Sequence, residues 1–112
     1  MNLLQKICFV LLLTTFSSVY GGSCFDGDIN TCLRESEQGD SSAQYNLGVM
    51  YYNGQGVLHQ DYKEAVKWWR KSAEQGVHES QKSLGDMYYN GEGVVQDYKE
   101  SFKWYRKSAK QG

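Results

Sequence analysis

The sequence lacks proline entirely, so no residue in it breaks a helix by removing a backbone hydrogen-bond donor. Histidine and cysteine are scarce. Beyond the N-terminal segment there are only His59, His78, Cys24 and Cys32, which are too few and too scattered for a zinc site. No stretch beyond residue 21 is apolar enough to cross a membrane. We therefore expect neither a bound metal ion nor a cofactor.

Catalytic sequence motifs are missing as well. The chain contains no Ser-x-x-Lys, Lys-Thr-Gly, Gly-x-Ser-x-Gly or His-Glu-x-x-His string. His78 is followed by a glutamate but not by the second histidine of a metalloprotease helix, and we expect His59 and His78 to be exposed loop residues. The Gly-Gln-Gly string at residues 54–56 is too short for a dinucleotide-binding loop. The sequence therefore predicts a protein that is not an enzyme.

The first 21 residues have the order of a secretory signal peptide. Lys6 is their only charged residue, residues 7–13 are apolar, and threonine and serine follow. The apolar run is too short for a permanent membrane helix. Cleavage after Gly21 fits best, with Val19 and Gly21 as the small residues before the cut; an uncleaved anchor is the alternative. We expect a secreted or periplasmic protein with no membrane insertion after cleavage.

Charge is nearly balanced in the mature chain. Removing Lys6 from the 12 basic residues leaves 11 against 13 acidic ones, a net charge of −2. Nucleic-acid binding requires a basic excess that displaces counterions from the phosphates. We therefore expect no nucleic-acid partner.

Two cysteines remain after cleavage, because Cys8 leaves with the signal segment. An even pair in an oxidising compartment favours a disulfide between Cys24 and Cys32. Free thiols and a lipid-modified Cys24 are the alternatives. The residues before Cys24 are Gly-Gly-Ser, without the large aliphatic residue expected in a lipoprotein signal.

An internal repeat dominates the rest of the chain. With His59 treated as an insertion, residues 40–76 align with residues 77–112, and 23 of the 36 pairs are identical. A unit of this length indicates stacked supersecondary structures. We expect an N-terminal loop and capping helix in residues 22–38, repeat 1 in residues 39–76 and repeat 2 in residues 77–112.

Each repeat has the pattern of two helices. In the first helix, Ala43, Leu47, Met50 and Tyr51 recur at helical spacing and predict a buried stripe. The aspartates before the helices, Asp40, Asp61 and Asp97, are predicted N-caps. Glu64 and Glu100 complete apparent capping boxes, and Gly54, Gly56, Gly91 and Gly93 are expected in left-handed turns.

Further positions have predicted packing roles. Ile29, Cys32, Leu33 and Ser36 share one face of the capping helix. Gly48 and Gly85 lie inside helices in both copies, so we expect a close helix crossing there. We expect the core to include the aromatic residues on the stripe and opposite it, Tyr51, Trp69, Tyr88 and Trp104.

The combined string Leu-Gly-x-Met-Tyr-Tyr-x-Gly-x-Gly-Val, Asp-Tyr-Lys-Glu and Lys-Trp-aromatic-Arg-Lys-Ser-Ala-x-Gln-Gly resembles the Sel1-like repeat, in two copies over residues 40–112. The resemblance implies an all-α fold, an α/α superhelical solenoid of two repeats plus an N-terminal half repeat. It also implies an adaptor or scaffold for protein complexes. His59 lengthens the first loop, and Ser80 and Ser101 replace the usual alanine, which we expect to loosen the packing slightly.

The resemblance also raises an alternative function. One cysteine-rich branch of the family is linked to penicillin binding and β-lactam hydrolysis, and its members carry a cysteine pair in each repeat. The corresponding positions here are Ser36 with Gln44 and Ala73 with Gln81, and the Cys24–Cys32 pair is out of phase with them. The β-lactam alternative therefore has no visible machinery in this sequence.

In stacked helix pairs the first helices line the concave surface. Tyrosine is common in binding hot spots, and several tyrosines point away from the buried stripe. Our candidate residues for binding a protein or peptide partner are Tyr45, Asn46, Val49, Tyr52, Asn53, Lys82, Ser83, Asp86, Tyr89 and Asn90. Self-association is a third hypothesis, because we expect Phe102, Trp104 and Tyr105 of the uncapped last helix to form an exposed end.

Overall fold

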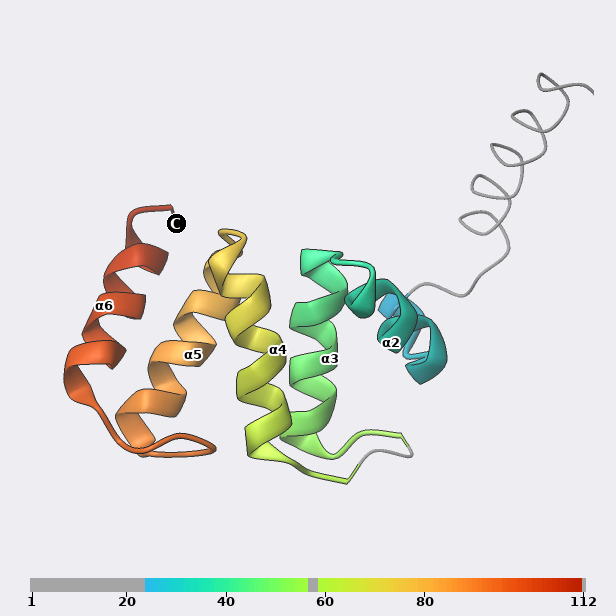
Figure 1. The fold of residues 1–112 in the computed structure, drawn as a ribbon, viewed down its shortest axis with the longest axis horizontal. Coiled ribbons are helices and arrows are strands. Elements are labelled where there is room, and N and C mark those ends of the chain that lie inside the picture. The colour runs from blue at the N-terminus through green and yellow to red at the C-terminus, as the bar shows by residue number, and fades with distance from the viewer. Residues whose placement is uncertain (1–23, 57–58, 112) are drawn as a thin grey trace, which may run out of the picture.

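The computed structural model describes residues 24–56 and 59–111, and these are helical with no strand among them (Figure 1). The signal peptide predicted for residues 1–21 lies outside the described residues. The elements, in chain order, are the 3-10 turn η1 (Cys24–Asp26) and the helices α2 (Ile29–Glu37), α3 (Ser41–Asn53), α4 (Tyr62–Glu74), α5 (His78–Asn90) and α6 (Tyr98–Ala109).

The helices stack in the order of the sequence. Helix α3 packs on α4 and α5 packs on α6 to form the two repeats, while α2 packs on α3 and α4 on α5 to join successive units (Figure 1). The all-α solenoid with two repeats and an N-terminal half repeat, predicted from the sequence, is therefore confirmed.

The predicted helix caps are present. The side chains of Asp40, Asp61 and Asp97 each accept a hydrogen bond from the backbone N–H three residues later, at 2.7, 3.1 and 3.1 Å. Gly54 and Gly91 end α3 and α5 with φ angles of 67° and 70°, a left-handed conformation in which glycine is favoured. These groups satisfy backbone donors and acceptors that a helix end leaves free.

The capping boxes predicted from Glu64 and Glu100 do not form. The backbone N–H that Glu64 would have to bind, that of Asp61, donates instead to the carbonyl of Tyr51 at 2.8 Å. Glu64 lies 3.6 Å from Lys67 on its own helix. Repeat 2 has the same arrangement, with distances of 2.9 and 3.5 Å. The backbone bond pins the start of each second helix to the end of the first helix of its repeat.

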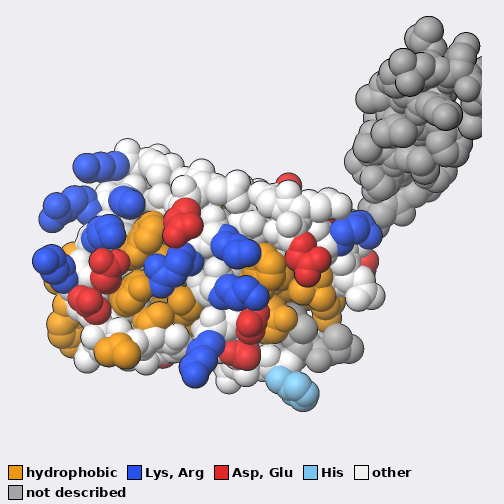
Figure 2. Space-filling model, viewed as in Figure 1, with side chains coloured by type: hydrophobic (Ala, Val, Ile, Leu, Met, Phe, Trp, Pro, Cys, Tyr) orange, Lys and Arg blue, Asp and Glu red, His pale blue; other side chains and the backbone are white. Residues whose placement is uncertain are grey.

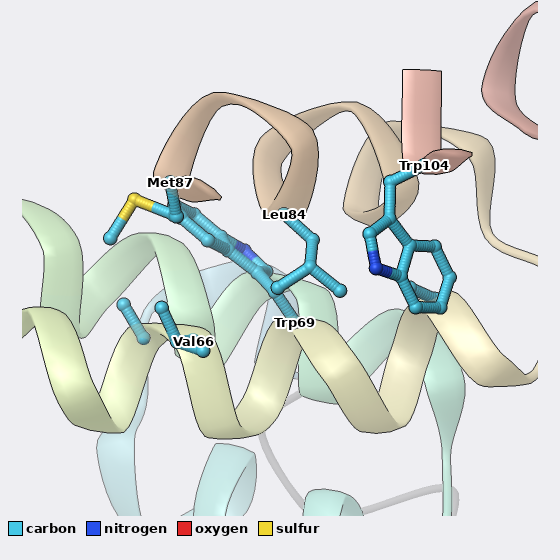
Figure 3. Packing of buried hydrophobic residues seen from close by; sticks show 7 residues of the cluster. Val66, Trp69, Leu84, Met87 and Trp104 are labelled. Carbon is cyan, nitrogen blue, oxygen red and sulfur yellow. The ribbon is translucent and has the colours of Figure 1, made fainter. Parts of the chain in front are cut away.

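Two clusters of buried side chains form the core. In the larger cluster, Val66 and Trp69 of α4 meet Leu84 and Met87 of α5, with Trp104 of α6 in the same group (Figure 3). Trp69 and Trp104 are only 5% and 4% exposed, which confirms their predicted burial. The other cluster joins α2, α3 and α4 and contains Cys24, Cys32, Ala43, Leu47, Met50 and Trp68.

The aromatic residues at the predicted exposed end differ in their burial. Phe102 is 57% exposed, as expected. Trp104 was predicted both in the core and at this exposed end; the second prediction is wrong, because Trp104 is buried in the larger cluster with residues of α4 and α5. Tyr105 is half-buried against α5. Tyr51 and Tyr88, predicted as core, are half-buried at the edge of the clusters.

The two mid-helix glycines allow aromatic rings to approach the first helices. A Cβ atom on Gly48 would lie 2.4 Å from the indole of Trp69, and one on Gly85 would lie 2.6 Å from the ring of Tyr105. The predicted close approach is confirmed, and what approaches is an aromatic side chain of the second helix. Each ring therefore packs directly on the backbone of the first helix.

Two buried glutamines, one at each junction, join a repeat to the helix that precedes it. The side-chain amide of Gln44 donates to the carbonyl of Ser36 on α2, and that of Gln81 donates to the carbonyl of Ala73 on α4, both at 3.1 Å. Both glutamines are 4% exposed. The same kind of hydrogen bond therefore joins α3 to α2 and α5 to α4.

The serines at the usual alanine positions are fully buried and hydrogen-bonded. Ser80 donates to the hydroxyl of Ser72 at 2.6 Å, and Ser101 donates to the carbonyl of Gly85 at 2.8 Å. Because a buried hydroxyl is costly only when it lacks a partner, these hydroxyls add contacts between helices. The structure gives no sign of the slight loosening expected at these positions.

The disulfide between Cys24 and Cys32 is present, as predicted, and connects η1 to α2. Cys32 is completely buried, and Ser36 on the same face of α2 is 1% exposed. Ile29 and Leu33 of that face are partly buried against the second cluster. The predicted face of the capping helix is therefore confirmed.

Candidate functional site

Six of the ten predicted binding residues on α3 and α5 line two hollows. The first, of about 400 Å³, lies between η1 and α3 and includes Asn46 and Val49. The second, of about 170 Å³, contains Tyr52 of α3 with Asp86 and Asn90 of α5. Its full lining, called the acidic hollow below, is Tyr52, Trp69, Ser83, Asp86, Met87, Asn90 and Glu92.

Other predicted residues lie elsewhere. Tyr45, Asn53, Lys82 and Tyr89 line neither hollow. Tyr45 is half-buried, and its carbonyl accepts a hydrogen bond from the Trp69 indole at 3.1 Å. Tyr89 is 47% exposed and packs on Tyr98 of α6, with ring centroids 5.1 Å apart. The helical spacing grouped these residues by face, but it did not indicate which of them packs sideways on a neighbouring helix.

The sequence reasoning missed three residues of the acidic hollow, Trp69, Met87 and Glu92, of which Met87 was predicted only as part of the buried stripe. Trp69 was assigned only to the core, yet part of its ring reaches this surface beside Tyr52, with centroids 5.5 Å apart. Glu92 belongs to the glycine turn and accepts a hydrogen bond from the Tyr52 hydroxyl at 3.4 Å. A signal for Glu92 was present, because it replaces Gln55 at a position where the neighbouring repeat residues are identical.

Both tyrosine hydroxyls around the hollow are held protonated. Burial, and then the hydrogen bond to Asp86, raise the pKa of Tyr105 to about 12. Burial, and then the Glu92 carboxylate, raise the pKa of Tyr52 above its usual value. The hydroxyl of Tyr105 donates to Asp86, and that of Tyr52 donates to Glu92. The hollow therefore presents two carboxylates, and no basic side chain is among its lining residues.

The raised pKa of Tyr105 predicts a loss of stability at alkaline pH. Because its pKa in the folded protein lies above the ordinary tyrosine value of 10.0, its contribution to stability is complete below about pH 10 and is lost as the pH rises towards 12. We expect Asp86→Asn to lower this pKa towards 10 without reaching it, since burial is the larger cause. The measurement is an absorbance titration at the tyrosinate band, with Tyr105→Phe subtracted to isolate the residue. An unchanged pKa in Asp86→Asn would contradict the assignment.

The histidines are both exposed. His59 lies in the loop between α3 and α4, as predicted. His78 was also expected in a loop, but it is the first residue of α5, with its ring Nε2 3.0 Å from the Glu79 carboxylate. Across residues 24–56 and 59–111, no three histidine, cysteine, aspartate or glutamate side chains are grouped as a metal site. Within the same ranges, every helix is too short or too polar to reach across a lipid bilayer.

Successive antiparallel helix pairs, with a hydrogen-bonded seam between units, define an α/α solenoid built from tandem repeats. The family model that matches is the Sel1 repeat, over residues 41–77 and 78–112. The chain belongs to the Sel1 repeat family. Sel1 repeats generally form protein–protein interaction modules and are typically non-catalytic scaffolds.

Two solved structures illustrate the relationship. A protective antigen of uropathogenic Escherichia coli strains with an SLR fold has 45% identity and a TM-score of 0.73, covering 75% of this chain and 18% of its own. A Sel1 repeat protein from Oxalobacter formigenes has 40% identity and a TM-score of 0.72, covering 74% of this chain and 34% of its own. The chain thus spans between about a fifth and a third of these relatives. The search of curated proteins found no match.

Proposed function

We infer that this protein is a secreted or periplasmic interaction module, and that the acidic hollow between α3 and α5 binds a basic side chain from an extended segment of a partner protein. The observation that carries this proposal is the pairing of two carboxylates with aromatic rings. Asp86 and Glu92 supply the negative charge, while Tyr52 and Trp69 supply apolar surface beside it. A lysine or arginine side chain fits both features, because its stem packs on rings and its head pairs with carboxylates.

The size of the hollow favours a single side chain over a small-molecule ligand. Its volume of about 170 Å³ is below the roughly 300–1,000 Å³ that small-molecule sites occupy. The first hollow, at Asn46 and Val49 on the same helix α3, has a volume of about 400 Å³ and offers room for further residues of the same segment. Helix α3, which borders both hollows, carries no charged residue. The charges that select the partner therefore come from Asp86 and Glu92 in the acidic hollow, and from Asp26 in the first hollow.

The test is the binding of partner-derived peptides by isothermal titration. The peptides are segments of proteins that the mature chain captures from the secreted or periplasmic fraction. Each peptide is also made in a second form, in which glutamine replaces its basic residues. We expect Asp86→Asn with Glu92→Gln to weaken binding about tenfold, which corresponds to roughly 1.4 kcal/mol. The amide oxygen at position 86 can still accept the Tyr105 hydrogen bond, so the melting curve should change little.

Two further variants make this test specific. Lys82→Gln is the matched control, because Lys82 is an exposed charge on α5 outside both hollows. Tyr52→Phe removes the hydroxyl but keeps the ring, which packs on Tyr62 and Trp69 at centroid distances of 5.1 and 5.5 Å. Tyr52→Ala is unsuitable, since it would disturb that packing as well. Equal binding by the double variant and the unaltered chain would exclude the acidic hollow as the site.

A further inference from the structure

The outward side of α6 carries an exposed apolar stripe. Tyr98, Phe102, Tyr105 and Ala109 recur at i, i+4, i+7 and i+11, the spacing of one helical face, called the α6 face below. Tyr98 and Phe102 are 51% and 57% exposed and Ala109 is exposed as well, whereas Tyr105 is half-buried against α5. Large apolar side chains exposed together on one face indicate an interaction site.

The same positions one repeat earlier are covered by a helix. Val66 and Ala73 of α4 correspond to Phe102 and Ala109, and they are only 5% and 2% exposed. Helix α5 covers them with Leu84 and other side chains of the larger cluster (Figure 3). The α4–α5 contact is therefore an internal template for a helix lying on the α6 face.

The template also includes polar contacts. On α4, the carbonyl of Ala73 accepts from the Gln81 amide at 3.1 Å, and Arg70 donates to the Tyr88 hydroxyl at 2.5 Å. The corresponding groups on α6 are the Ala109 carbonyl and the Arg106 guanidinium. Among residues 24–56 and 59–111, no glutamine or tyrosine side chain binds them. The covering helix thus needs a glutamine followed seven residues later by a tyrosine.

The charge around this face is strongly basic. A groove of about 760 Å³ is lined by Tyr98, Lys99, Glu100, Phe102, Lys103, Arg106, Lys107 and Lys110. Five of these eight side chains are cationic and one is acidic. Figure 2 shows basic side chains gathered over the end of the molecule that α6 forms, at the left of the view. Lys110 replaces Glu74 of α4, so repeat 2 is more basic here than its template. Charge complementarity therefore selects an acidic partner.

We propose that the α6 face binds an acidic amphipathic α-helix of a partner protein, placed as α5 is placed on α4. A second copy of this chain is a poor occupant. Its α3 is covered by α2 and its α5 by α4, so neither presents a free face of the required kind. Two α6 faces packed together would bring their lysine and arginine rows into contact, which is unfavourable.

The probe is a helix-stapled, fluorescein-labelled peptide of residues 78–90, in which glutamate replaces the exposed Lys82 and Tyr89. The staple is needed because short isolated helices are marginally stable. The peptide retains the α5 residues that contact α4, which are Ser80, Gln81, Leu84, Met87 and Tyr88. We expect saturable binding to the mature chain by fluorescence anisotropy, weakening as salt is added. A control peptide has alanine in place of Gln81 and Tyr88, and lysine instead of glutamate at positions 82 and 89. It should bind at least tenfold more weakly than the probe.

Substitutions in the protein locate the site. Phe102→Asp should weaken binding at least tenfold and Arg106→Gln several-fold, with melting curves close to that of the unaltered chain because both side chains are exposed. Lys63→Gln is the matched control, since Lys63 is the α4 counterpart of Lys99 and lies outside the groove. Glu92→Gln should leave this binding unchanged, because Glu92 lies outside the groove, and this separates the α6 face from the α3–α5 site.

Three outcomes would overturn the proposal. One is the absence of saturable peptide binding to the folded chain. Another is equal binding by Phe102→Asp, Arg106→Gln and the unaltered protein. The third is a dimer at micromolar concentration, seen by light scattering, that Phe102→Asp dissociates; this would assign the α6 face to a second copy.

Discussion

Replacing Trp69 with alanine is expected to remove a large part of the protein's free energy of unfolding. The indole is 5% exposed, belongs to the cluster shared by α4 and α5, and packs against the backbone at Gly48. Its Nε1 also donates to the Tyr45 carbonyl. Removing a buried tryptophan costs about 3–5 kcal/mol, and a small domain has only about 5–15 kcal/mol in total. Circular dichroism during urea titration measures the change.

Two variants calibrate the Trp69 result. Trp69→Phe keeps an aromatic ring in the cluster and should leave a cooperative transition at lower urea. Phe102→Ala truncates an aromatic side chain that is 57% exposed, and we expect a change within about 0.5 kcal/mol. A cooperative transition of Trp69→Ala near that of the unaltered protein would show that the α4–α5 cluster contributes little to the fold.

Reduction of the Cys24–Cys32 disulfide is expected to destabilise the protein by about 2–3 kcal/mol. The bond closes a loop across a sequence separation of eight, and constraining such a loop in the unfolded chain accounts for this magnitude. Both cysteines belong to the cluster that seats α2 on α3. The urea midpoint should therefore fall when dithiothreitol is added, with the loss of helix concentrated at the N-terminal end.

The control for this experiment is a chain in which both cysteines are alanine. Its midpoint should match that of the reduced protein and should not respond to dithiothreitol. Hydrogen exchange of α2 amides, compared with those of α5, shows where the loss occurs. Equal midpoints for the oxidised and reduced protein would mean that packing alone holds α2 in place.

Much of the fold could be predicted because each local sequence pattern occurs in both copies of the repeat. The stripe through Leu47 and Leu84 gave the buried face, and the aspartate caps and glycine turns gave the helix limits. The capping box failed for a tertiary reason, since the Asp61 N–H already binds the Tyr51 carbonyl. Local pattern identifies a potential partner, but a contact from another helix decides which partner is used.

The candidate site was harder to predict than the fold. Helical spacing assigns residues to a face, yet it does not say how side chains lean towards the next helix. Tyr89 leans towards α6 and leaves the hollow, whereas Trp69 belongs to the core and still borders the surface. Glu92 comes from a turn, where periodicity gives no information. Position 92 was indicated only by the comparison of the two copies, in which Glu92 aligns with Gln55.

The placement of α2 on α3 has a consequence for assembly. Head-to-tail contacts between identical subunits form a ring or an open filament, and both require that the two complementary surfaces are free. In this protein α2, held to η1 by the Cys24–Cys32 bond, occupies the α3 surface that would receive the α6 face of another copy. Head-to-tail stacking of copies through the α3 surface of one and the α6 face of the next is therefore blocked at α3.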